Sequence, residues 1–224
     1  MLKVRPASRV EQVAEAMLEQ IGSGHWQVGD RIPPEPKLLE MLGVARNTMR
    51  EAVRALAHAG VLEIRHGDGV YVRARTDTEG ILRRRFAPVD LLDILTARRA
   101  LEVEAARSAA ERRTPEDLAR LAAAWHERCS SGTTAAGIAF HRAVVDASHN
   151  VVLIELYQGL VSAVAESLRH SAVPGELPEL PADLHEGLYE AIRAGDPVRA
   201  AAEATRHLDT LIDALRSNRS NRSN

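Results

Sequence analysis

The chain has 224 residues, a net charge of −2 and an aromatic content of only 3%. This length allows one large or two small domains, and abundant Ala, Leu and Val with few aromatics favour packed helices over a β-sandwich. The single cysteine, Cys129, excludes an intramolecular disulfide, and without a secretory segment we expect a cytoplasmic protein. No apolar run approaches the ~20 residues that span a bilayer.

The first 75 residues have the element order of a winged helix-turn-helix. Ser8 can cap the first helix, Gly43 ends the second and Gly60 ends the third. Residues 66–69 contain two glycines and predict the tip of a hairpin. The pattern predicts helices over 8–23, 36–42 and 45–59, and strands over 61–65 and 70–73.

After residue 75 the strand signals end and helical patterns follow. We expect residues 76–89, which contain three consecutive arginines and Pro88, to be a linker. The expected helices cover 90–112, 114–129, 134–148, 151–170, 181–194 and 197–216. The last residues, 217–224, repeat Arg-Ser-Asn and are expected to be disordered. The fold class is therefore mainly α, with a winged domain over 1–75 and an all-helical bundle over 90–216.

One face of the helix over 45–59 has the side chains that a DNA-reading helix needs. Its apolar residues turn inward, and the opposite side carries long donors that can pair with guanine or adenine edges. Thr48 and the backbone N–H groups at the helix start can hold phosphate. The alternative is an ordinary solvated face, but its place between a helix-turn and a Gly-tipped hairpin favours DNA binding. The candidate DNA-binding residues are Arg46, Asn47, Thr48, Arg50, Arg54, His66 and Gly67.

Three segments of this half resemble the GntR family of regulators: residues 29–35, residues 42–56, and residues 60–72 with the run His66-Gly67-Asp68-Gly69. The resemblance implies that Arg46, Arg50 and the wing residues His66 and Gly67 contact DNA. The family often has a basic residue where this chain has Pro36, so a phosphate contact there is lost or taken over by Lys37.

Three histidines of the C-terminal half lie on the apolar sides of three different helices: His141, His185 and His207. A single histidine in such a place is usually a core residue, but three together suggest a metal site, because imidazole is the commonest metal ligand. Arg98 also lies on an apolar stripe, and a buried guanidinium must be paired. Its partner is either Glu102, one turn on, or the carboxylate of a ligand.

This half resembles the effector domain of the fatty-acid-regulator branch of the GntR family (FadR/FCD). The resembling residues are the run 97–102, Phe140-His141, His149-Asn150, His185 and His207. The resemblance implies that the three histidines bind a divalent metal (zinc or nickel) and that Arg98 binds the effector's carboxylate. The carboxylate ligand expected four residues before His141 is Gly137 here, which leaves open positions for water or an anion, or indicates that the metal has been lost.

The sequence thus predicts a homodimeric transcriptional regulator, most simply a repressor, that binds operator DNA and responds to a small organic acid. The alternative from another class is a metal-dependent hydrolase that uses the three histidines, but no base or nucleophile motif accompanies them. A helical interaction module with a vestigial DNA domain is a third class, against which the intact arginine face argues.

Overall fold

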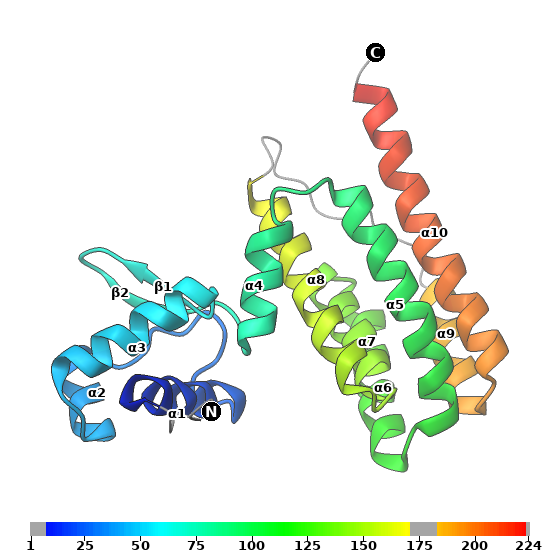
Figure 1. Ribbon diagram of the computed structural model, residues 1–224. Coiled ribbons are helices and arrows are strands. Elements are labelled where there is room, and N and C mark those ends of the chain that lie inside the picture. The colour runs from blue at the N-terminus through cyan, green and yellow to red at the C-terminus, as the bar shows by residue number, and fades with distance from the viewer. Residues whose placement is uncertain (1–7, 171–182, 223–224) are drawn as a thin grey trace, which may run out of the picture. The chain divides into compact units, whose positions relative to one another are not determined.

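The computed structural model describes residues 8–170 and 183–222 of the chain. These residues form two compact units, one up to Arg84 and the other from Arg85 onward. Ten helices and one two-stranded sheet make up the described parts of both units, so the mainly α fold class is confirmed (Figure 1).

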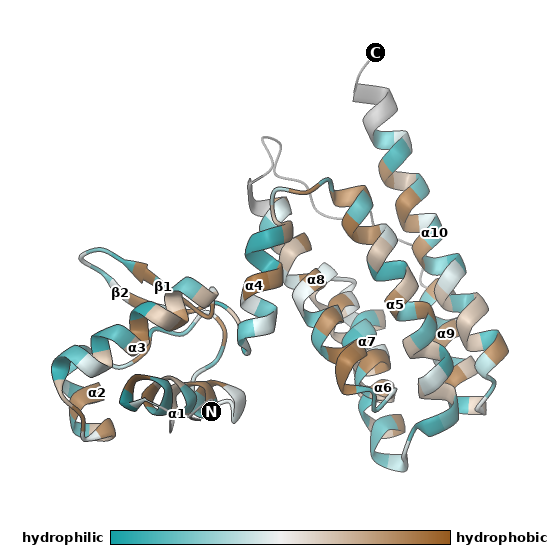
Figure 2. Ribbon diagram, viewed as in Figure 1, coloured by the Kyte–Doolittle hydropathy of each residue, from teal (hydrophilic) through white to brown (hydrophobic). Residues whose placement is uncertain are grey.

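The first unit is a winged helix-turn-helix. Its elements are α1 (Arg9–Gly22), α2 (Glu35–Leu42), α3 (Arg46–Ala59), β1 (Leu62–Arg65) and β2 (Gly69–Val72). The strands are antiparallel with Leu62 opposite Val72, and Arg31 adds an isolated bridge to Tyr71. Apolar residues from the three helices and the hairpin form one core, which fixes α3 against α1 and exposes its charged side (Figure 2).

The segment that we expected to be a linker is largely helical, and its helix, α4 (Asp77–Phe86), begins against the winged unit. Thr76 caps its N-terminus by accepting a hydrogen bond from the backbone N–H of Glu79. Gly80 lies directly against the backbone of Ala59 and Gly60, where a Cβ would be only 2.5 Å from the Ala59 oxygen. Arg83 donates to the Gly60 carbonyl at 3.0 Å. The missing side chain of Gly80 is what permits this close contact, and the sequence pattern did not reveal it.

The second unit is a bundle of helices around α5. It comprises α5 (Leu91–Arg112), α6 (Pro115–Ser131), α7 (Thr134–Asp146), α8 (Val151–His170), α9 (Asp183–Ala194) and α10 (Pro197–Arg222). Helix α5 contacts α7, α8, α9 and α10, and its alanines let these neighbours approach closely. Side-chain caps begin three of these helices: Thr114 caps α6, Asn150 accepts from the first turn of α8, and Asp196 accepts from the first turn of α10.

One expectation for this unit was wrong. Helix α10 continues to Arg222, through most of the tail expected to be disordered; no Gly or Pro interrupts it, and arginines near a helix C-terminus are favourable. Residues 223 and 224 lie outside the described residues. Helix α8 has the length and apolar composition of a membrane span over Val151–Leu168, with a mean hydropathy of 1.5, a test that a core helix of a soluble protein also passes.

Candidate functional site

Helix α3 presents its candidate DNA-binding side chains to solvent. Arg46, Asn47, Arg50 and Arg54 are all exposed, and Thr48 is half-buried at the first turn. Glu35 at the start of α2 pairs with two of the arginines, at 2.8 Å to Arg46 Nε and 3.4 Å to Arg50 Nε. One carboxylate therefore orients both guanidinium groups before any ligand arrives.

The wing lies beside the same face of α3. The residues of its tip, His66 and Gly67, are exposed, and Gly67 has φ of 78°, a left-handed conformation that favours glycine. A cleft of about 490 Å³ runs between α3 and the hairpin, and Arg50, Arg54 and His66 all line it. The structure thus brings three of the candidates, Arg50, Arg54 and His66, to one cleft, whereas Arg46, Asn47, Thr48 and Gly67 do not line it.

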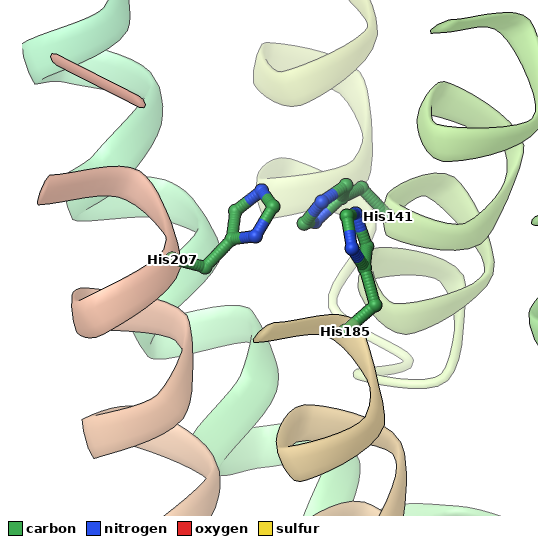
Figure 3. Close-up of side chains that lie close together, drawn as sticks. All are labelled: His141, His185 and His207. Atoms are coloured by element: carbon green, nitrogen blue, oxygen red, sulfur yellow. The ribbon is translucent and has the colours of Figure 1, made fainter. Parts of the chain in front are cut away.

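In the helical unit, the three predicted histidines meet although they come from α7, α9 and α10. Figure 3 shows the rings of His141, His185 and His207 pointing toward one another. Their ring centroids are 4.4 to 5.2 Å apart, and one nitrogen from each lies within 4.8 Å of the others. All three side chains are buried.

Two of these imidazoles are held in the neutral form. Burial, followed by the neighbouring His141 and Arg128, lowers the pKa of His185 to about 3. Burial and the two other histidines lower the pKa of His207 as well. Neutral imidazoles can bind a metal ion without first losing a proton.

Glu102 supports the third histidine from behind. Its Oε2 lies 2.8 Å from His141 Nδ1, which leaves Nε2 of that ring as the free ligand atom. Burial opposes ionisation of Glu102, but Arg98 and His141 outweigh it and lower its pKa to about 2. A buried carboxylate behind a ligand histidine is the usual support for a metal-binding imidazole.

Arg98 forms an ion pair with Glu102, one of the two partners that the sequence suggested for it. Its Nε donates to Glu102 Oε1, both side chains are buried, and its guanidinium lies 5.6 Å from the centre of the Tyr157 ring. Arg98 also borders the small cavity of about 60 Å³ in front of the histidines. Arg98 therefore pairs internally with Glu102 and also lines the cavity, and its binding of a ligand carboxylate stays a prediction.

The donor set fits a divalent cation in part. Three neutral or carboxylate-supported imidazoles are a common ligand set for zinc with open positions. At a Zn–N distance of ~2.0–2.1 Å, a tetrahedral site places its ligand nitrogens about 3.4 Å from one another. The three rings must therefore move slightly closer together to bind zinc. On the side of Gly137 the cavity is bordered by Arg128, whose charge disfavours a cation.

Comparison with known proteins accounts for both units. Residues 9–72 match the gntR family of bacterial regulatory proteins, and residues 93–210 match the FCD domain. The chain belongs to the GntR family, with a C-terminal FCD domain. An Escherichia coli (strain K12) protein named "Putative L-lactate dehydrogenase operon regulatory protein" is 33% identical over 92% of this chain and 85% of its own length.

Two further proteins extend this picture of the GntR family. The galactonate operon transcriptional repressor of Escherichia coli (strain K12) is 28% identical over 87% of this chain and 92% of its own. The solved structure of Streptococcus agalactiae GntR has a TM-score of 0.51 and 26% identity, covering 91% of this chain and 99% of that one. These proteins are transcription regulators and not enzymes, so the hydrolase alternative has no support.

Sequence reasoning missed three residues of this GntR protein: Glu35 as the partner of two arginines, Glu102 as the partner of His141, and Arg128 at the cavity. Glu35 and Arg128 lie on different helices from their neighbours in the site, so no spacing within one helix could reveal them. For Glu102, the four-residue spacing within α5 predicted the contact with Arg98, but it gave no sign of the contact with His141 on α7.

Proposed function

We propose that this GntR-family regulator is a repressor that binds a two-fold symmetric operator as a homodimer and is released by a small carboxylate. The observation that supports it most is the presence of two separate features: an exposed arginine face on α3, and a partly enclosed cavity in the helical unit that two arginines and three histidines line. The first has the donors that read base edges, and the second is large enough only for a small ligand.

The carboxylate class rests on the cavity and on the relatives. Arg98 supplies guanidinium donors, and the three histidines supply either direct hydrogen bonds or a bound divalent metal, zinc or nickel, that would hold a ligand oxygen. The two E. coli relatives are named for operons of L-lactate and galactonate, both hydroxycarboxylic acids. A small hydroxycarboxylate is therefore the effector that we propose.

The remaining assignments follow from this function. We propose that Arg46, Asn47, Arg50 and Arg54 contact bases, that Thr48, His66 and Gly67 contact the backbone of operator DNA, and that the protein is cytoplasmic. Helix α8 packs against α5 and α7, as a helix of the bundle does.

A thermal-shift panel tests the proposal. Acetate, L-lactate, galactonate and succinate are added to the purified protein, since a ligand that binds the native state raises its melting temperature. The acid that raises it should also lower affinity for an operator fragment from the promoter next to the gene. A stabilising acid that leaves operator affinity unchanged would contradict release by the effector.

A further inference from the structure

Arg128 in the last turn of α6 lines the histidine cavity, together with Gly137 and Ile138 of α7. Two glycines leave room for its side chain. A Cβ at Gly137 would lie 3.6 Å from Arg128 Nε, and a Cβ at Gly132 would lie 3.9 Å from Nη1. The guanidinium thus extends from the α6–α7 turn over the first turns of α7 and reaches the cavity that His141, His185 and His207 line.

The two arginines of this cavity differ in how their charges are balanced. Glu102 neutralises Arg98, and both are buried. Among residues 8–170 and 183–222, the half-buried side chain of Arg128 has no hydrogen-bond or ion-pair partner. Its positive charge helps to lower the pKa of His185 and of His207. A positive charge beside a partly enclosed cavity, without a carboxylate of its own, attracts an anion.

We propose that Arg128 is the counter-ion of the effector's carboxylate, at the mouth of the three-histidine cavity. This inference rests on the proposed function, in which a small carboxylate occupies that cavity. Arg98, already balanced by Glu102, contributes hydrogen-bond donors but no net charge. The carboxylate accepts from the Arg128 fork, and the rest of a small monoanionic acid faces the imidazoles.

The test compares charged ligands with neutral ones. Acetate, L-lactate and galactonate are titrated calorimetrically into wild type and Arg128→Met, each beside its amide, which has nearly the same shape without the charge. A charge-assisted hydrogen bond supports a loss of about 10- to 100-fold in carboxylate affinity in Arg128→Met. The preference of the protein for acid over amide should disappear in that variant. Arg107→Met is the matched control, because Arg107 is exposed and pairs with Glu104 away from the cavity.

A second pair of variants changes the neighbour instead of the arginine. Gly137→Asp places a carboxylate next to Arg128, where a Cβ has only ordinary contacts. In protein kept free of metal with a chelator, so that this carboxylate cannot act as a metal ligand, it should compete with the acid and lower acid affinity as Arg128→Met does. Gly137→Asn has almost the same size without the charge and should keep most of the affinity.

The outcomes separate this inference from the proposed function. Acids that bind Arg128→Met as tightly as wild type, or equal binding by Gly137→Asp and Gly137→Asn, would overturn the role of Arg128 and leave effector binding intact. Wild-type protein that none of the acids binds would overturn both. A thermal melt of each variant shows whether a loss of binding reflects unfolding instead. If Arg128→Met does not fold, the comparison of Gly137→Asp with Gly137→Asn tests the role of the Arg128 charge.

Discussion

At the scale of single residues, Glu35 of α2 links the two helices of the helix-turn-helix by forming ion pairs with Arg46 and Arg50 of α3. It holds Arg46 and Arg50 with their side chains 66% and 58% exposed. Exposed ion pairs add little stability, with a median of roughly 0–1 kcal/mol. The pairs therefore matter for the orientation of the guanidinium groups more than for folding.

Arg50→Ala should weaken operator binding far more than it weakens folding. A lost base contact costs about 1–3 kcal/mol, whereas an exposed side chain with one surface ion pair contributes less than about 1 kcal/mol to the free energy of unfolding. Operator affinity and urea unfolding are measured on the same preparation. Unchanged operator affinity would remove Arg50 from the reading face.

The three histidines should bind about one divalent metal ion per chain. Their ligand atoms already lie within 4.8 Å of one another, and His185 and His207 need no deprotonation. Elemental analysis of protein loaded with zinc or nickel measures this, with His185→Gln as a variant that removes one ligand and His126→Gln, at an exposed position of α6, as the control. Wild type that takes up no more metal than His185→Gln would make the cluster a polar cavity only.

At the scale of elements, two contacts decide how helices meet. Gly80 sets the approach of α4 to the end of α3, and Asp117 joins the start of α6 to the α7–α8 turn. Asp117 accepts from the backbone of Thr114 at 2.8 Å and pairs with Arg120 and with His149 Nε2, the latter at 2.7 Å. His149 has φ of 52°, a strained value for a residue with a side chain, and this contact helps to hold it there.

Gly80→Ala should destabilise the protein by roughly 1–3 kcal/mol, because the added methyl meets backbone that cannot move aside as a side chain would. Gly22→Ala is the control, because Gly22 is also a helical glycine, but a Cβ added there would have nothing within 4 Å. Chemical unfolding of both variants is the measurement. Equal stabilities would show that α4 does not dock on α3 in solution.

Asp117→Asn should lower the free energy of unfolding at pH 7 by about 1–3 kcal/mol, since charged hydrogen-bond partners are lost. Burial raises the pKa of Asp117, but hydrogen bonds from Thr114, His149 and Arg120 outweigh burial and lower it. The stabilisation is therefore complete above the ordinary aspartate pKa of about 3.9 and is lost as pH falls through the lower folded value. Unfolding curves at several pH values should show a smaller difference between variant and wild type below about pH 4. A difference that does not shrink there would mean that Asp117 does not act through its charge.

At the scale of the whole molecule, the candidate DNA-binding face of α3 and the three-histidine cavity belong to different compact units. In the function that we propose, a ligand bound in one unit changes DNA binding by the other, so the two binding equilibria are coupled. Whatever its route, this coupling is a free energy between two binding equilibria.

The effector should bind the protein–operator complex more weakly than the free protein, by the same factor by which it weakens operator binding. This reciprocity is a thermodynamic necessity, and such factors are typically about 5- to 150-fold. Calorimetric titration of the effector into protein with and without saturating operator fragment measures it. Equal affinities in the two titrations would show that the effector does not act on DNA binding.

The sequence by itself determined the order of elements in the winged unit, the helices from α5 onward and the DNA-binding candidates, but not α4, because helix periodicity, caps and turn glycines are local properties. It also placed each of three histidines on the apolar side of its helix. Only the tertiary structure decided what these residues meet: that the histidines converge, that Glu102 serves both Arg98 and His141, and that Arg128 reaches their cavity. Such contacts join helices far apart in the chain, and they depend on packing such as the close approach at Gly80, which no local pattern records.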